Sequence, residues 1–346
     1  MTDMKATMGE TAGPSQSAVP KHGGDLTALK AMPDAFAGDW LDLSTGINPL
    51  PWPVPAVAPD AWQRLPEAAA EQALLAAARQ CYGCPAEAGL VALPGTQAAI
   101  QLLPRLFAPA RVTVLGPTYA EHAHCWRPAR HAVTETDSLP ANLGGTDILI
   151  AVNPNNPDGR MLGRDLLLRW QAELAARGGW LILDEAFADV VPEASLASEA
   201  DRPGLVILRS FGKFFGLAGL RLGFVLGDPV VTNALRQAAG PWAVSGPALA
   251  IGTAALADTG WQQAMRDELR ARARRFDQMM RDRDIHVLGG TSLFRLAKVA
   301  DAAGFAARLQ QQGIHVRIFE QRPQWMRFGL PADEAEFWRR FDRVLV

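Results

Sequence analysis

Short apolar runs alternate with helical patterns between residues 89 and 226, and this alternation constrains the fold more than any other feature. The runs are rich in valine, isoleucine and leucine, which is typical of strands buried on both faces of a sheet. These runs are VTVLG (112–116), DILIAVN (147–153), WLILDEAF (180–187), LVILRS (205–210) and LRLGFVL (220–226). Helical patterns occupy Thr96–Phe107 and Arg164–Arg177. The alternation predicts an α/β protein with a mainly parallel sheet that is covered by helices.

A second, smaller unit is expected in the C-terminal part of the chain. Residues 259–284 have the pattern of a long helix with a charged outer face. After this helix, two strand-like pieces, IHVLGGTSLFRLAK and GIHVRIFE, flank the helical segment AAGFAARLQQQ. We therefore expect a large domain over residues 41–240, and a small α+β domain made of residues 21–40 together with 241–346. Residues 1–20 are small and polar, which predicts a mobile tail and no secretory signal.

Charge and cysteine content narrow the classes of function. The formal net charge is -2 and no long basic run occurs, so neither a nucleic acid nor a membrane surface is predicted as a partner. No segment approaches the roughly 20 apolar residues of a transmembrane helix. The low, odd number of cysteines argues against a disulfide framework and predicts a cytoplasmic protein. Cys81 and Cys84 form a C-x-x-C without a second ligand pair, so we expect core packing and no metal site.

The segment SFGKFFGLAGLRLGF (210–224) surrounds a single lysine, Lys213, with glycines. A phosphate-binding P-loop reads G-x-x-x-x-G-K-[ST], but Ile207 and Phe214 break that pattern. The second use of such a lysine is as the amine that forms a Schiff base with pyridoxal phosphate. This cofactor requires an acidic partner for its pyridine nitrogen, a donor for its ring hydroxyl and an anion site for its phosphate.

Predicted strand ends supply the two groups for the pyridine ring. Asp184 ends the run WLILD, and a carboxylate there would keep the pyridinium protonated. The loop NPNNPDG (153–159) follows another strand, and its Asn156 is a candidate donor to the ring oxygen. Because both strands belong to the parallel sheet, these side chains are expected at the same edge.

The phosphate group also has candidate partners. The motif PGTQ (94–97) opens a predicted helix, whose free backbone N–H groups and dipole favour an anion. Gly95, Thr96 and Gln97 are therefore candidate cofactor residues. Ser210 and Arg221 flank the lysine and add a hydroxyl and a guanidinium for the same phosphate.

The order of these motifs, PGTQ … PTY … NPNNP-x-G … DEAF … S-x-G-K-x-x-G-L-A-G-L-R, resembles that of the fold-type I pyridoxal-phosphate enzymes. Within them it is similar to the class I/II aminotransferase group, which includes histidinol-phosphate aminotransferase. The resemblance spans roughly residues 21–331. It implies that pyridoxal 5'-phosphate is held by Lys213, Asp184, Asn156, Ser210 and Arg221. It also implies that Tyr119 stacks on the cofactor ring.

The two ends of the chain narrow this resemblance. KHGGDL (21–26) and LDLSTGINPLPWP (41–53) resemble segments of the cobalamin-pathway threonine-phosphate decarboxylases, and VRIFE (316–320) and WMRFGLP (325–331) resemble their C-terminal pattern. The resemblance implies that Arg327 binds the substrate carboxylate. Further candidates for substrate contacts are His22, Gly23, Asn48, Arg317 and Arg322.

Two positions depart from the aminotransferase pattern. Phe187 stands where that group usually has a tyrosine that donates to the ring oxygen. Leu65, in RLPE, stands where a tyrosine often reaches the cofactor phosphate of the neighbouring subunit. Asn156 is then the expected side-chain donor to the ring oxygen.

The resemblance implies a pyridoxal-phosphate-dependent carboxy-lyase that converts L-threonine O-3-phosphate into 1-amino-2-propanol O-2-phosphate for cobalamin biosynthesis. An aminotransferase acting on histidinol phosphate or a related amine, with 2-oxoglutarate or glutamate, uses the same groups, and the sequence leaves this alternative open. A cofactor-binding regulator would carry a DNA-binding helix-turn-helix, which residues 1–20 are too short to encode. The resemblance also implies a homodimer.

Overall fold

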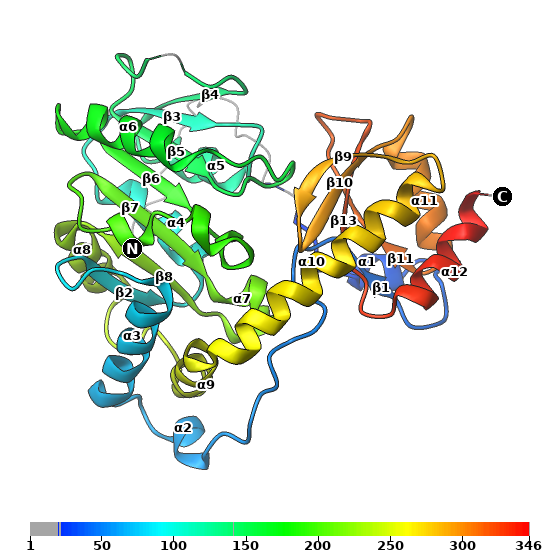
Figure 1. The fold of residues 1–346 in the computed structure, drawn as a ribbon, viewed down its shortest axis with the longest axis horizontal. Helices are drawn as coiled ribbons and strands as arrows, with labels where there is room; N and C mark the ends of the chain where they lie inside the picture. Colours follow the sequence, from blue (N-terminus) through cyan, green and yellow to red (C-terminus); the bar gives the residue numbers. More distant parts are fainter. Residues whose placement is uncertain (1–19, 21, 141, 346) are drawn as a thin grey trace, which may run out of the picture.

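The structure, a computed structural model, describes residues 20, 22–140 and 142–345, which form three sheets (Figure 1). Apart from Pro20, the predicted mobile tail at residues 1–20 lies outside the described residues. The largest sheet has seven strands in the order β2-β8-β7-β6-β5-β3-β4. These strands are β2 (Gly89–Leu93), β3 (Arg111–Leu115), β4 (Ala132–Thr136), β5 (Ile148–Val152), β6 (Trp180–Asp184), β7 (Leu205–Ser210) and β8 (Gly223–Gly227).

The seven-stranded sheet is mainly parallel, as the sequence predicts. Strands β4, β3, β5, β6 and β7 pair in parallel, and only β8 runs against its neighbours β7 and β2. Parallel strands need a return crossing, which is usually a helix. The helices that follow β2, β3 and β5 are α4 (Thr96–Leu102), α5 (Glu121–Trp126) and α6 (Arg164–Ala175).

Alternate residues of the central strands enter two separate buried clusters, one on each face of the sheet. Leu149 and Ala151 of β5 belong to one cluster, and Ile148 and Ile150 belong to the other. Both faces of β5 are therefore buried, and all of its residues are buried. This explains why the sequence shows continuous apolar runs instead of an alternation of apolar and polar residues.

Several predicted boundaries differ from the structure by a few residues. Strand β6 ends at Asp184, before the predicted residue 187, because the backbone N–H of Ala186 donates to Asp184 Oδ1 at 3.0 Å and turns the chain. Strand β8 begins at Gly223, after the predicted residue 220, because Arg221 is left-handed with φ 55°. Helix α4 ends at Leu102 and continues as a 3₁₀ turn, Leu103–Arg105.

A second sheet is antiparallel, with the order β12-β13-β10-β9. Its strands and covering helices are β9 (His286–Thr291), β10 (Phe294–Lys298), β12 (Arg317–Ile318), β13 (Trp325–Gly329), α11 (Ala302–Gln311) and α12 (Glu334–Leu345). Beside it, β1 (Leu41–Asp42) pairs in parallel with β11 (Ile314–His315). Residues at the beginning of the predicted large domain thus pair with the C-terminal part of the chain, and the division into domains stays a prediction.

Helix α10 (Thr259–Arg281) runs from the large sheet to the second sheet (Figure 1). Near its start, the ring of Trp261 packs 5.4 Å from that of Phe214 in α7 (Phe211–Phe214). Near its end, the ring of Phe276 lies 6.0 Å from that of Phe328 in β13. The helix therefore fixes the second sheet relative to the segment that carries Lys213. The remaining helices are α1 (Thr27–Lys30), α2 (Pro59–Gln63), α3 (Ala68–Tyr82), α8 (Pro229–Ala239) and α9 (Gly246–Ala257).

The C-x-x-C motif lies in the core. Cys84 is buried and Cys81 packs half-buried against the same apolar cluster. Burial raises the pKa of the Cys81 thiol to about 11, which keeps it protonated at neutral pH. Within the described residues, no group of histidine, cysteine, aspartate and glutamate side chains could hold a metal ion, and no helix is long and apolar enough to span a membrane.

Candidate active site

A cavity of about 570 Å³ lies at the carboxyl ends of the parallel strands and is also lined by β12 and β13. It gathers the predicted cofactor and substrate residues, with the exception of Asn48 and Arg322. The predicted residues that line it are His22, Gly23, Gly95, Thr96, Gln97, Tyr119, Asn156, Asp184, Ser210, Lys213, Arg221, Arg317 and Arg327.

The register of the large sheet explains why residues far apart in sequence meet here. Val152 at the end of β5 pairs with Asp184 at the end of β6. In the antiparallel pairing of β7 with β8, Ser210 at the end of β7 lies opposite Gly223 at the start of β8. Parallel strands end at one edge, whereas the antiparallel β8 begins there. Lys213 and Arg221 both lie in the segment that joins β7 to β8, and both therefore reach the cavity from this edge of the sheet.

Lys213 presents its amine to this cavity. Among the described residues, none forms a hydrogen bond or ion pair with Nζ, which lies 6.0 Å from the centroid of the Phe187 ring. Burial lowers the pKa of the Lys213 ammonium to about 8, and the positive charges of Arg327 and Arg221 contribute to that lowering, whereas Asp184 opposes it. A lysine of this kind reaches its reactive neutral form near physiological pH.

Asp184 is held by a buried histidine that the sequence did not indicate as functional. Asp184 is 3% exposed, and its Oδ2 lies 2.9 Å from Nε2 of His122. The histidine comes from α5, and both partners of this pair are buried. A buried carboxylate with fixed partners is pre-oriented to accept a hydrogen bond from a heterocyclic nitrogen. The only signal for His122 in the sequence is its position three residues after Tyr119.

The backbone is tightly packed where β2 and β8 adjoin, beside the predicted anion site. Gly95 has φ 83°, and a Cβ added there would lie 2.8 Å from the Arg221 guanidinium. A Cβ on Gly223 would lie 2.6 Å from the backbone nitrogen of Thr96. The absence of side chains thus lets the first N–H groups of α4 approach the same space as Arg221 and Ser210. Backbone N–H groups, a hydroxyl and a guanidinium suit a phosphate.

Arg327 is a buried cation in the wall opposite the large sheet. It is 7% exposed; NH2 donates to the carbonyl oxygen of Ser44 at 2.8 Å, and NH1 donates to Oδ1 of Asn156. Burial lowers the pKa of Arg327 to about 10, and the charge of Arg317 contributes, so the side chain remains charged at neutral pH. Its buried Nε has no partner among the described residues. A buried cation that no described carboxylate neutralises is suited to bind an anionic group.

Tyr119 belongs to a polar network at the outer end of the cavity. Its hydroxyl donates to Oε1 of Gln97 at 3.1 Å, and its ring lies 5.6 Å from that of His22. Glu121 is the centre of this network, because its two carboxylate oxygens contact His22 at 2.8 Å and Gln97 at 2.9 Å. Glu121 is 6% exposed and was not indicated by the sequence.

Two predicted substrate residues lie elsewhere, which corrects the predictions for them. Asn48 donates through Nδ2 to the carbonyl oxygen of Phe214 at 2.8 Å, and its Oδ1 accepts from the backbone N–H of Leu50 at 2.9 Å. Its side chain thus supports the chain around Lys213 instead of facing the cavity. Arg322 forms an ion pair with Asp137 outside the cavity.

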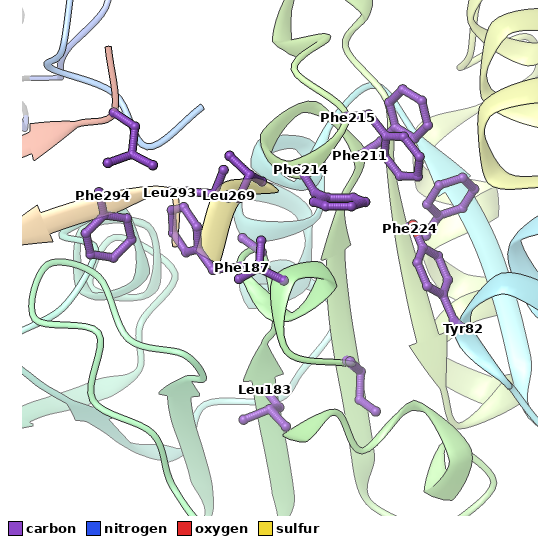
Figure 2. Close-up of a cluster of buried hydrophobic side chains, with 14 of the residues drawn as sticks. Tyr82, Leu183, Phe187, Phe211, Phe214, Phe215, Phe224, Leu269, Leu293 and Phe294 are labelled. Carbon is purple, nitrogen blue, oxygen red and sulfur yellow. The ribbon is translucent and has the colours of Figure 1, made fainter. Parts of the chain in front are cut away.

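The two departures from the aminotransferase pattern are visible in the structure. Phe187 is buried and packs edge-on against Phe294, with ring centroids 5.0 Å apart (Figure 2). The Phe187 ring gives the cavity an apolar wall next to Lys213, and Phe294 supports this ring. Leu65 is exposed on the surface.

The chemistry of Lys213, of the supported Asp184 and of the narrow backbone site beside Arg221 fits the three functional parts of pyridoxal 5'-phosphate. The fold and the site thus define a pyridoxal-phosphate-dependent enzyme. The sequence matches the family "aminotransferase class I and II" over residues 39–337, and the chain belongs to this family.

Comparison with individual proteins shows which members of this family the chain resembles more closely in sequence. The chain is 46% identical to a threonine-phosphate decarboxylase from Pseudomonas aeruginosa, over 94% of this chain and 97% of that protein. It is 43% identical to a threonine-phosphate decarboxylase from a Sinorhizobium species, over 91% of this chain and 94% of that protein. A histidinol-phosphate aminotransferase from Desulfitobacterium hafniense is more distant, with 29% identity over 64% of this chain and 66% of that protein. The fold is similar to that of a histidinol-phosphate aminotransferase from Clostridium acetobutylicum, with a TM-score of 0.76, 20% identity and coverage of 88% of this chain and 98% of that one.

Proposed function

We propose that the protein decarboxylates L-threonine O-3-phosphate to 1-amino-2-propanol O-2-phosphate, a reaction of cobalamin biosynthesis. The observation that carries this proposal is the buried Arg327, which has no carboxylate partner among the described residues, in a cavity that also holds Arg317 and His22. A substrate with a carboxylate and a phosphate offers anionic groups to the two arginines and hydrogen-bond acceptors to the imidazole. The close relatives named threonine-phosphate decarboxylase support the same substrate.

Cofactor binding is assigned to the residues at the strand ends. Asp184, held by His122, is the partner of the pyridine nitrogen, and Asn156 is the donor to the ring oxygen. The start of α4, together with Ser210 and Arg221, holds the phosphate. When bound, pyridoxal phosphate supplies the electron sink for cleavage of a bond to the substrate Cα.

The chain's own residues determine which bond is cleaved. Arg327 fixes the substrate carboxylate, and it is itself held by Ser44 and Asn156. Cleavage requires alignment of the breaking bond, so the orientation of this carboxylate separates decarboxylation from transamination. The apolar ring of Phe187, which packs against Phe294, excludes water next to Lys213. With a pKa near 8, Nζ of Lys213 is poised to return a proton to Cα after carbon dioxide leaves.

The proposal includes a homodimer, which the family membership supports. Trp62 and Leu65 are large apolar side chains on the surface of the single chain, as is Trp242. Aromatic side chains such as these two tryptophans are enriched at protein–protein interfaces. Sedimentation analysis should give twice the mass of the chain, whereas a monomer at micromolar concentration would contradict this part of the proposal. The cytoplasmic location stays a prediction.

Mass-spectrometric product analysis tests the reaction. Purified protein loaded with pyridoxal phosphate is given L-threonine phosphate without any keto acid. We expect aminopropanol phosphate and carbon dioxide to accumulate over many turnovers, and Lys213→Ala to abolish both. No turnover of this substrate, together with turnover of histidinol phosphate when 2-oxoglutarate is added, would instead identify an aminotransferase.

A further inference from the structure

The segment around His22 spans the cavity between the two sheets. On the side of the large sheet, Nε2 of His22 contacts Oε1 of Glu121, on α5, at 2.8 Å. On the other side, the backbone N–H of Gly24 donates to Oγ of Ser44 at 2.8 Å, and Ser44 follows β1. The carbonyl oxygen of the same Ser44 accepts from Arg327. The segment is therefore attached at one end to the carboxylate of Glu121 and at the other to the residue that supports Arg327.

Glu121 is a fixed, ionised group beside the cavity, where it contacts two residues that line it, His22 and Gln97. Its second oxygen accepts from Nε2 of Gln97 at 2.9 Å, and Gln97 in turn accepts from the Tyr119 hydroxyl. Burial alone would raise the pKa of the Glu121 carboxyl, but hydrogen bonds from His22 and Gln97 hold this pKa below its usual value. An ionised carboxylate with little exposure requires hydrogen-bond partners, and His22 and Gln97 supply two of them.

We propose that Glu121 is a positioning residue for the substrate, because it holds the imidazole of His22 at the outer end of the cavity, where that imidazole binds the substrate phosphate. This inference rests on the proposed function. His22 itself is largely exposed, so without the carboxylate its side chain has many accessible rotamers. Glu121 removes that freedom before the substrate arrives, so less conformational entropy is lost on binding.

Steady-state kinetics of three variants test the inference. The variants are Glu121→Gln, which keeps the shape and removes the charge, His22→Ala, and the double variant. We expect Glu121→Gln to raise KM for L-threonine phosphate about tenfold while kcat changes less than about threefold, because a hydrogen bond to a charged group is lost and the bond-breaking groups are untouched. If the carboxylate acts through His22, the double variant is no worse than His22→Ala alone.

Two controls separate positioning from a general structural effect. Glu135→Gln, an exposed glutamate on β4, should leave KM unchanged. Absorbance titration should give the same affinity for pyridoxal phosphate in Glu121→Gln as in the parent protein, and thermal denaturation should show that each variant is folded. The inference is overturned by effects of Glu121→Gln and His22→Ala that multiply in the double variant, or by a fall in kcat at constant KM.

A binding measurement keeps the inference separate from the proposed reaction. Calorimetry with inorganic phosphate on the cofactor-loaded proteins needs no turnover. We expect weaker phosphate binding in both single variants than in the parent protein. A parent protein that binds phosphate but does not decarboxylate threonine phosphate would overturn the proposed function alone, whereas equal phosphate affinity in parent and Glu121→Gln would overturn the inference alone.

Discussion

The side-chain oxygen of Asn156 accepts a hydrogen bond from the guanidinium of Arg327, so the loop after β5 holds a residue of β13 in the second sheet. This contact joins the proposed cofactor site to the proposed carboxylate site. Because Oδ1 accepts from Arg327, the Nδ2 group of Asn156 remains for the proposed hydrogen bond to the cofactor ring. The amide of Asn156 thus links Arg327 to the proposed cofactor site.

Arg327→Lys should lower kcat/KM about 100-fold, because a lysine ammonium cannot keep both the Ser44 and Asn156 contacts and still form a paired interaction with a carboxylate. The affinity for pyridoxal phosphate should change little. The measurement is steady-state decarboxylation together with a cofactor titration. Arg339→Lys, at an exposed arginine of α12, is the matched control. Full activity of Arg327→Lys would show that the substrate carboxylate binds elsewhere.

His122→Asn should weaken cofactor binding about tenfold, because the shorter side chain withdraws a hydrogen bond from the buried Asp184 carboxylate. Absorbance titration of the cofactor-free protein with pyridoxal phosphate measures this effect. His124→Asn serves as the control, since this histidine lies on the same helix and is not hydrogen-bonded to Asp184. Equal affinities in the two variants would refute a supporting role for His122.

The sequence predicted the sheet, and the meeting of the candidate cofactor residues at its edge, for one physical reason. Parallel strands buried on both faces require continuous apolar runs, and the polar residues that follow such runs meet at one edge. Asp184, Asn156 and Lys213 each follow such a run closely, so their meeting could be predicted without coordinates.

The substrate side was less predictable because it depends on contacts between distant segments. The Glu121 carboxylate meets His22 across 99 positions of the sequence, and no periodic pattern encodes such a pair. The motif that contains Asn48 predicted a substrate residue, but the nitrogen and the oxygen of its side-chain amide both form hydrogen bonds with backbone groups. Arg322 lies close in sequence to Arg317, yet it forms its ion pair outside the cavity with Asp137.

Gly223→Ala should weaken cofactor binding and lower the free energy of unfolding by about 1–3 kcal/mol, the usual range for overpacking. The added Cβ would lie 2.6 Å from the backbone nitrogen of Thr96, and neither strand β8 nor helix α4 can yield as a flexible side chain would. Chemical denaturation and a cofactor titration test the two effects. Gly219→Ala is the matched control, because a Cβ there meets nothing within 4 Å. If the two variants behave alike, the tight approach of β8 to α4 is not required.

Lys213→Met should raise the free energy of unfolding of the cofactor-free protein at pH 7. The folded protein lowers the pKa of Lys213 from 10.5 to about 8 by burial, with help from nearby positive charges. Below about pH 8 this lysine is protonated in both states, so the folded protein carries the full cost of a buried charge, about 3 kcal/mol from the size of the shift.

The same linkage gives the pH dependence of this difference. Between about pH 8 and pH 10.5 the unfolded chain still holds the proton that the folded protein has released, so the parent protein gains stability as the pH rises through this window. The difference in the free energy of unfolding between Lys213→Met and the parent protein should therefore decrease from pH 8 towards pH 10.5. Comparing the two proteins by urea denaturation at each pH cancels the other titrating groups. A variant that is less stable than the parent at pH 7, or an advantage that grows with pH, would show that the amine of Lys213 is not held in a charge-disfavouring site.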